Sequence, residues 1–402
     1  MTIQTAGDHS ASLATDRGGG NISVTNSTLN TSGSGSPLIY STGAIEVSDV
    51  TGTAEGSQIV GMEGLNHIKI YDSELSSTIT DKTASDPVAN GVIIYQSTSG
   101  DADTSTGECA QFQVVDSTLS SKIESGAMFY VTNTSADILL SGTTLDFDSS
   151  KAKLLQIEGN DANNWGRAGS NGADVTFTGL GETLTGDISV DSISSLDLYF
   201  LDGTTYTGQI QSVANAGGQN DSAANAGDQN DSVTNANATV TVNLDQDSTW
   251  IVTGDTTVFT LNAEDGAQLV DADGKTVSIV ADGSTVVKGD SDLTVTVTGS
   301  YSQTVTTSEA NEISAPTISR SDFDRCYGTD TAFGTDGKTT STDTEDKPDV
   351  LADETEASTQ LVPSTEAAET STPQSTTPWA IAGVLIIAAI AGFSAYRKKT
   401  KS

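Results

Sequence analysis

The chain has 402 residues, enough for one large or two ordinary domains, and a net charge of −37 from 54 acidic and 17 basic residues. Nucleic acid is excluded as a partner, because binding to phosphates needs clustered Lys and Arg side chains. The acidity instead favours solubility and repulsion from anionic surfaces. The two cysteines, Cys109 and Cys326, are too few for a disulfide framework and lack zinc spacing. Two alternatives remain open: a Cys109–Cys326 bridge or two free thiols.

The first residues, MTIQTAGDHSASLATDRGGG, contain neither a basic n-region nor an apolar h-region, so they do not form a secretory signal. Their composition already resembles the repeats that follow. We therefore expect this chain to be the C-terminal part of a longer exported protein, or to carry a misassigned start.

A short phrase recurs with a period of about 23 residues, consisting of an alternating apolar triplet, a polar turn and often a Leu. It reads ISVTNSTL at Ile22, IEVSDVTG at Ile45, IKIYDSEL at Ile68, FQVVDSTL at Phe112, ILLSGTTL at Ile138 and VTFTGLGETL at Val175. A second short strand lies between the phrases, as PLIYS, QIVGM, VIIYQ, MFYVT and LLQIE. The longer steps contain Gly/Asn/Asp-rich insertions. Each period thus carries at least two strands with corners between them.

This repeat predicts an all-β fold, a right-handed parallel β-helix (solenoid) whose coils bury their apolar residues by stacking. The alternative is a series of β-sandwich modules, which also produce short strands at regular spacing. Sandwich modules would repeat in units of roughly 100 residues. No unit of that length repeats in the sequence, so the solenoid is favoured.

The later part of the chain changes composition twice. Two copies of a ten-residue polar segment, NAGGQNDSAA and NAGDQNDSVT, interrupt the strands, which then return as TVTVNLDQDSTWIVTGDTTVFTLNA. From Ser314 the strands stop, and five of the seven prolines follow in a Ser/Thr/Asp/Glu-rich background. Such a segment cannot bury a core and should be a disordered, extended stalk. Its aromatic part, Ser321–Phe333, is expected to cap the end of the solenoid.

The run Trp379–Tyr396 contains no charged residue and is about 27 Å long as a helix, close to the roughly 30 Å of a bilayer core. Trp379 and Tyr396 occupy the two ends, where interfacial aromatic residues belong. The basic residues Arg397, Lys398, Lys399 and Lys401 follow at once. The positive-inside rule places this tail in the cytoplasm and the preceding chain outside the cell membrane. Membrane lipid is therefore an expected partner.

The predicted organisation combines these segments. It consists of β-helix repeats over 1–212, a polar insertion over 213–238, C-terminal coils over 239–313, an acidic stalk over 314–377, one transmembrane helix over 378–396 and a basic tail over 397–402.

The coils, the STWIVTGDTTVFTLNA segment and the Thr/Pro stalk before an apolar helix together resemble bacterial surface adhesins with a parallel β-helix (pectin-lyase-like) ectodomain. The tail is similar to those of Gram-positive surface proteins. It departs from sortase substrates, because LPxTG is absent and the nearest string, LVPST at Leu361, lacks the Gly. The resemblance implies a surface protein held by its helix rather than by a covalent wall linkage.

No catalytic residue is predicted. A pectate-type lyase needs a base beside a carboxylate cluster, and only Arg167 lies among turns with nearby acids, Asp161 and Asp174. His9 and His67 have no partner in a recognisable triad or metal spacing. A surface role is the simpler interpretation of all three.

Two weak binding signals remain. Asp271 and Asp273 resemble the start of a calcium loop, although Asp282 stands where its Glu is expected, so a solvated turn is the alternative. Trp165, in a Gly/Asn loop, is the better ligand-contact candidate, whereas Trp250 in an alternating strand is expected to pack. No cofactor other than this Ca²⁺ is expected.

The sequence therefore predicts a non-enzymatic, surface-anchored adhesin or structural ectodomain, with glycans or host surface proteins as partners. The alternative is a membrane-tethered polysaccharide lyase or glycoside hydrolase of pectin-lyase-like fold.

Overall fold

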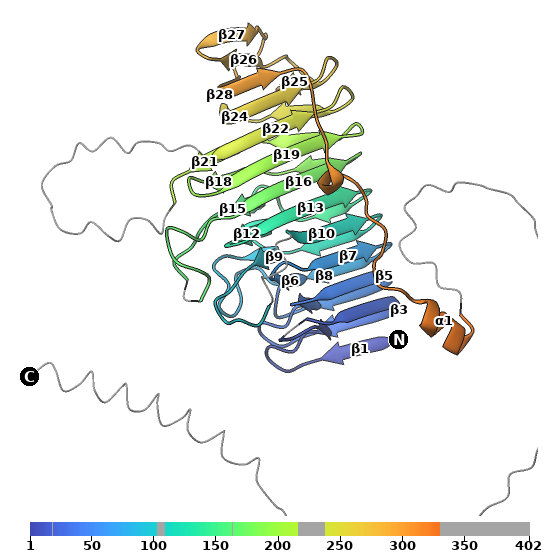
Figure 1. Cartoon of the computed structure of the whole chain (residues 1–402). Coiled ribbons are helices and arrows are strands. Elements are labelled where there is room, and N and C mark those ends of the chain that lie inside the picture. The colour runs from blue at the N-terminus through green and yellow to red at the C-terminus, as the bar shows by residue number, and fades with distance from the viewer. Residues whose placement is uncertain (18, 103–108, 163, 216–237, 330–402) are drawn as a thin grey trace, which may run out of the picture. The chain divides into compact units, whose positions relative to one another are not determined.

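The regular secondary structure of the described chain consists mainly of parallel β-sheets in the computed structural model (Figure 1). The structure describes residues 1–17, 19–102, 109–162, 164–215 and 238–329. One sheet is 16-stranded (sheet A), one is 8-stranded (sheet B) and one is 4-stranded (sheet C). The chain visits the sheets repeatedly, and neighbouring strands within a sheet come from successive circuits. Each circuit of the chain therefore lies against the one before it.

The strands are short and distributed over the whole described chain. Sheet A contains β1 (Thr2–Thr5), β3 (Asn21–Thr31), β5 (Ala44–Ala54), β7 (His67–Tyr71), β8 (Glu74–Ser77), β10 (Ala110–Val115), β11 (Thr118–Ser121), β13 (Ser135–Ser141), β14 (Thr144–Asp146), β16 (Asp174–Leu180), β19 (Ser195–Leu201), β22 (Thr239–Leu244), β24 (Thr256–Ala263), β26 (Ser278–Ala281), β27 (Ser284–Val287) and β28 (Thr294–Ser302). Sheet B contains β2 (Leu13–Ala14), β4 (Ile39–Ser41), β6 (Val60–Glu63), β9 (Asn90–Tyr95), β12 (Ala127–Thr132), β15 (Lys153–Ile157), β18 (Ile188–Asp191) and β21 (Ile210–Val213). Sheet C contains β17 (Thr183–Thr185), β20 (Thr205–Gly208), β23 (Thr249–Val252) and β25 (Gln268–Val270).

The strand pairing is parallel throughout the three sheets, except where β26 and β27 form an antiparallel hairpin. Parallel neighbouring strands need a crossover connection between them. Here each crossover consists of the strands and loops that the chain passes through before it returns to the same sheet. The prediction of an all-β chain with parallel sheets is confirmed. The arrangement is compatible with a β-solenoid.

The register of sheet A follows the sequence repeat. Ile22, Ile45, Ile68, Phe112 and Ile138 lie side by side on consecutive strands. The next partner in this row is Phe177, not Val175, which pairs with Ala136 instead. The insertion before β16 obscures this shift of two residues in the sequence. Because side chains alternate with a period of two, the shift leaves the same face buried.

A left-handed residue lies within each of the long strands β3 and β5 and directly follows β7, β10, β13, β16 and β19, which explains the recurring polar turn. Its φ lies between 46° and 66° at Asn26, Asp49, Asp72, Asp116, Gly142, Gly181 and Asp202. Asn and Asp tolerate this conformation better than other non-glycine residues, and glycine adopts it freely. The turn therefore selects Asn, Asp or Gly at one position per coil, which is why the phrase recurs.

The inward side chains of the three sheets form one continuous hydrophobic core. Phe129 packs edge-on between Phe112 and Phe177, with ring centroids 6.2 Å and 5.8 Å apart. Further along the stack, Tyr206 and Trp250 are fully buried, with ring centroids 6.2 Å apart. Stacking thus buries large side chains that no single coil could cover.

After β28 the chain turns back along the outer face of sheet A as a C-terminal strap, residues 303–320, which includes the short helix η2 (Glu309–Asn311) (Figure 1). Its bonds follow outward-facing residues coil by coil, joining Asn311 to Thr178, Ser314 to Gln113, Ala315 to Lys69, Thr317 to Glu46 and Arg320 to Ser23 and Thr25. The strap therefore runs from the last coils back to the first.

The predicted stalk over 314–377 thus has its first residues hydrogen-bonded to sheet A. Helix α1 (Ser321–Tyr327) follows the strap and contains no buried residue, so its described part does not form the predicted cap. Beyond residue 329, the rest of the stalk, the predicted helix with Trp379 and Tyr396, and the basic tail lie outside the described residues. Among residues 1–329 as described, no helix is long and apolar enough to cross a membrane.

Candidate functional site

A groove lies on the outer face of sheet B, near its first strands. Its volume is about 380 Å³. It is lined by His9, Ala11, Ala14, Asp16, Gly35, Pro37, Tyr40, Ser57, Gln58, Gly61, Ala84, Ser85, Asp86, Tyr95 and Trp165. We call it the aromatic groove, after Tyr40, Tyr95 and Trp165. Its size is in the range typical of small-molecule sites.

The sheet register creates the floor of the groove. Ala14, Tyr40, Gly61 and Ile93 are successive members of one outward row across β2, β4, β6 and β9. Gly61 has no side chain, and a Cβ placed there would lie 3.5 Å from the ring of Tyr40. The row therefore opens a gap between Tyr40 and Ile93.

The buried carboxylate of Glu63 holds two of the aromatic side chains. Glu63 is 2% exposed, and its Oε2 accepts hydrogen bonds from the hydroxyls of Tyr40 at 2.7 Å and Tyr95 at 3.2 Å. Its Oε1 accepts hydrogen bonds from the hydroxyls of Ser97 and Ser99. Burial and the bond to Glu63 raise the pKa of Tyr40 well above its usual value, so the phenol stays a donor. Four hydroxyl donors thus satisfy one buried charge and fix the orientation of both tyrosines.

The third aromatic residue comes from the loop between β15 and β16. The carbonyl of Trp165 accepts a hydrogen bond from the Asn171 side chain at 2.8 Å, and the Trp165 ring packs against Tyr95 with centroids 4.1 Å apart. Trp165 is only 6% exposed because Ile93 and Tyr130 also pack against it. Trp165, the predicted ligand-contact residue, thus lies in the wall of the groove. Most of its surface packs against other side chains, including Tyr95, and little of it faces solvent.

The polar rim carries carboxylates. Asp16 is exposed and Asp86 is half-buried, and both line the groove. Burial raises the pKa of Asp86 to about 7, against the hydrogen bond from Asn90 and the positive charge of Lys82. An aromatic cleft that also holds a carboxyl group titrating near neutrality has the chemistry of a functional site.

The remaining predicted residues lie elsewhere. Arg167 is exposed, and within the described residues it forms no ion pair with Asp161 or Asp174. Cys109 is half-buried and Cys326 is exposed, and both are free cysteines.

The predicted calcium loop folds as a turn. Asp271 Oδ1 accepts hydrogen bonds from the backbone amides of Asp273 and Lys275, each at 2.9 Å. The Lys275 Nζ lies 3.2 Å from Asp273 Oδ2. Hydrogen bonds, first from Ser291 and then from Lys275, lower the pKa of Asp271. Its carboxylate is therefore already engaged by amides of its own turn.

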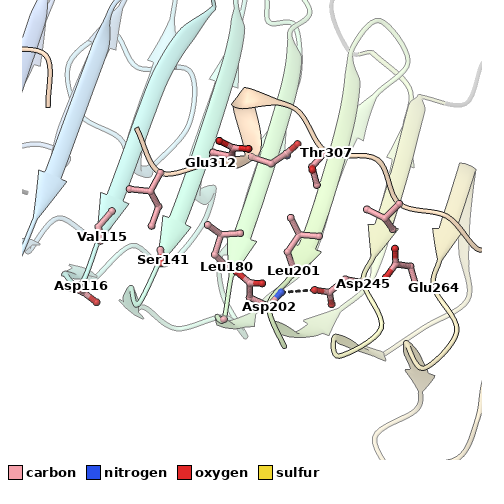
Figure 2. A pocket seen from close by; sticks show the side chains of 14 residues that line it. Val115, Asp116, Ser141, Leu180, Leu201, Asp202, Asp245, Glu264, Thr307 and Glu312 are labelled. Atoms are coloured by element: carbon pink, nitrogen blue, oxygen red, sulfur yellow. Dashed lines mark hydrogen bonds between the residues drawn. The ribbon is translucent and has the colours of Figure 1, made fainter. Parts of the chain in front are cut away.

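A second hollow of about 890 Å³ lies between the strap and the ends of the sheet A strands (Figure 2). Asp116, Asp202, Asp245, Glu264 and Glu312 line it together with apolar side chains, and Asp245 accepts the Asp202 amide at 2.6 Å. Across the described part of the chain, no three His, Cys, Asp or Glu side chains converge in a way that could hold a metal. These acidic side chains make the electrostatic potential in the hollow negative.

Several groups in these sites were not identified from the sequence. Tyr40 and Tyr95 lie within the apolar phrases PLIYS and VIIYQ and look like ordinary strand residues. Glu63 follows the phrase QIVGM directly. All three side chains have a polar end and lie on the outward face of sheet B, close to Gly61. The sequence shows this arrangement only once the register of sheet B is known.

Comparison with protein-family models, with curated proteins and with solved structures finds no match to this chain.

Proposed function

We propose that this chain is a non-enzymatic, surface-anchored adhesin-like protein that binds glycans in the aromatic groove. The arrangement of Tyr40, Tyr95 and Trp165 beside polar rim groups carries the proposal. Sugars present apolar C–H faces and hydroxyl edges, and aromatic rings flanked by hydrogen-bonding groups complement both. Because Glu63 holds the tyrosines in place, little conformational entropy is lost on binding.

We further propose that the three stacked sheets form a right-handed parallel β-helix of the pectin-lyase-like kind. Parallel pairing, one inward row per coil and a turn residue repeated each coil support this assignment. Right-handed crossovers also dominate among parallel connections. A crystal structure showing left-handed coils would contradict the proposal.

The proposed location is the outer face of a cell membrane, with the segment 378–396 as a single-pass anchor. The uncharged run between Trp379 and Tyr396 and the basic residues that follow support it. Protease treatment of intact cells that express the full chain behind an added secretory signal should digest residues 1–329 and leave a small membrane-bound fragment. Recovery of the intact chain from the soluble fraction would argue against the anchor.

Binding is best tested with the full chain in detergent micelles, screened on a glycan array and measured by calorimetry. Tyr40→Ala should weaken binding about tenfold or more, because one stacking ring and its contacts contribute on the order of 1.4 kcal/mol. Phe259→Ala is the matched control, since Phe259 is a 48% exposed aromatic residue on β24, outside the groove lining. Equal losses in the two variants, or no glycan binding by the parent protein, would contradict the proposal.

A glycoside hydrolase acting in the same groove is the second candidate. The pKa of Asp86, near 7, favours it, because inverting and retaining enzymes both need one protonated and one ionised carboxyl group. Asp16 would be the second carboxyl group of the pair. Release of new reducing ends from bound oligosaccharides, lost in Asp86→Asn, would replace the adhesin proposal with this one.

A further inference from the structure

The charge of the aromatic groove has one sign. Asp16 and Asp86 line it, the Glu63 carboxylate accepts hydrogen bonds from the hydroxyls of Tyr40 and Tyr95, and none of the lining residues is Lys or Arg. Arg17, next to Asp16 in sequence, points its Nε at Asp101 at 3.1 Å. Arg17, the basic residue adjacent to Asp16 in the sequence, is therefore already paired with another carboxylate.

We infer that the aromatic groove selects glycans that carry an ammonium group, such as oligomers of an amino sugar, over neutral glycans and over polyuronides. This inference rests on the glycan-binding function proposed above and names its ligand class. Two independent features support it: the aromatic lining and the two lining carboxylates, Asp16 and Asp86.

Aromatic rings attract ammonium groups through the negative potential of their faces, and the attraction grows when the site excludes water. Tyr40 and Tyr95 are half-buried in the groove, and Trp165 is almost fully buried behind them. The tyrosine hydroxyls donate hydrogen bonds to Glu63, which brings its carboxylate to the hydroxyl end of each ring. A carboxylate-bearing sugar would meet the same charges as repulsion, which adds to that of the chain's net charge of −37.

Asp86 makes the selectivity dependent on pH. It lies on the loop before β9, and the groups around it are Lys82 on the same loop, Asn90 and Tyr95 on β9, and the groove residues His9 and Asp16. Its pKa of about 7 means that its negative charge develops as the pH rises through neutrality. This change favours a bound cation at higher pH.

The test uses oligomers of N,N,N-trimethylglucosamine, whose charge does not depend on pH, beside N-acetylglucosamine and galacturonate oligomers of equal length. Calorimetry with the full chain in micelles is run at about pH 5.5 and about pH 8.5. We expect the trimethylated oligomer to bind at least several-fold more tightly than the N-acetylated one at the higher pH. We expect the galacturonate oligomer to bind weakest.

The variants test the role of Asp86. In a His9→Gln protein, which lacks the imidazole of the groove lining, the trimethylated oligomer should still bind more tightly as the pH rises, and adding Asp86→Asn should remove that dependence. Thr294, at the distant β28, hydrogen-bonds Asp255 through its backbone, so Asp255→Asn is a control carboxylate outside the groove. It should leave the pH dependence unchanged.

The outcomes distinguish this inference from the proposed function. Equal affinity for the acetylated and trimethylated oligomers would overturn the ammonium selectivity and leave glycan binding intact. Tightest binding of the galacturonate oligomer would overturn the selectivity outright. Absence of binding by all three at millimolar concentration would overturn the selectivity and count against glycan binding as well.

Discussion

The Glu46 carboxylate accepts hydrogen bonds from the backbone amide of Thr317 at 2.7 Å and from its hydroxyl at 2.9 Å, although the two residues lie 271 positions apart. Oε2 of the same carboxylate accepts the Ile318 amide at 3.1 Å. His67 Nε2 lies 3.4 Å from Oε1. Glu46 is completely buried by these partners. One side chain of an early coil therefore attaches the C-terminal strap to sheet A.

Glu46→Gln should release the strap locally. The variant replaces a charged acceptor with an amide that accepts fewer hydrogen bonds, and hydrogen bonds to charged groups contribute about 1.5–3 kcal/mol. Hydrogen exchange at the Thr317 and Ile318 amides should accelerate roughly tenfold to a hundredfold. Glu74→Gln, an exposed residue of β8, is the control and should change neither amide. Unchanged exchange in Glu46→Gln would show that other strap contacts suffice.

Acid should release the strap of the unaltered protein. Burial alone raises the pKa of Glu46, but hydrogen bonds from His67 and Thr317 lower it overall to about 2, from an ordinary value of 4.5. A carboxyl group whose folded pKa is lowered stabilises the fold above its unfolded pKa, and this stabilisation disappears as the pH falls toward the folded value. We expect up to ~3 kcal/mol to be lost between about pH 4.5 and pH 2. Exchange of the strap amides across that interval checks this, with Glu46→Gln showing a smaller change.

Gly126 should be intolerant of any side chain. Its φ is 68°, and a Cβ there would lie 1.9 Å from the carbonyl oxygen of Ala89 in the neighbouring coil. Gly126→Ala should therefore reduce the free energy of unfolding by about 3 kcal/mol or more. Gly100→Ala is matched in conformation, with φ of 76° but no atom within 4 Å, and should cost only about 1 kcal/mol. Urea unfolding of both variants separates the close approach of coils from backbone strain.

The sequence predicted the repeat and the buried rows, but not the strap. Ile45 and Ile68 alternate with polar residues in a regular pattern, and local periodicity is enough to assign them to the interior. Lys69 lies between apolar neighbours and looks solvent-exposed, yet it is 2% exposed because Ala315 lies against it. That contact joins residues 246 positions apart, and no local pattern encodes it.

The aromatic groove was predicted only in part for the same reason. Trp165 stood out because aromatic residues are unusual in a Gly/Asn loop. Tyr40 and Tyr95 did not stand out, because strands commonly contain tyrosines. The two tyrosines come together because neighbouring strands of sheet B pair laterally and because both bind Glu63. The register of β6 and β9 places Glu63 next to Tyr95.

The two thiols should react at different rates. Burial raises the pKa of the Cys109 thiol, and the nearby carboxylates of Asp137 and Asp174 raise it further. The thiolate is the reactive form, so Cys109 should label at least several-fold more slowly than the exposed Cys326. Mass spectrometry after timed maleimide labelling measures both rates. A native mass two hydrogens lower than that of the reduced chain, with no labelling, would instead show the disulfide.

Glu63→Gln should weaken glycan binding without unfolding the chain. A single amide oxygen cannot accept the four hydroxyl bonds that the carboxylate accepts, so Tyr40 and Tyr95 should lose their fixed orientation. We expect a loss of affinity of about tenfold, with a thermal unfolding midpoint close to that of the parent. Glu74→Gln, an exposed residue of β8 outside the groove lining, is the control and should retain the parent affinity. An unaltered dissociation constant in Glu63→Gln would exclude this positioning role.

The course of the strap also determines where a mechanical load enters the molecule. A pull on the chain beyond residue 329 reaches sheet A at Arg320, whose guanidinium donates to Ser23 at 2.9 Å and Thr25 at 3.0 Å. The next contacts toward β28 are at Thr317 and Ala315. We expect tension to peel these contacts one after another, each net bond contributing only about 0.5–3 kcal/mol, before any coil is strained. A tethered chain would thus lengthen under low force while its stacked sheets stayed intact.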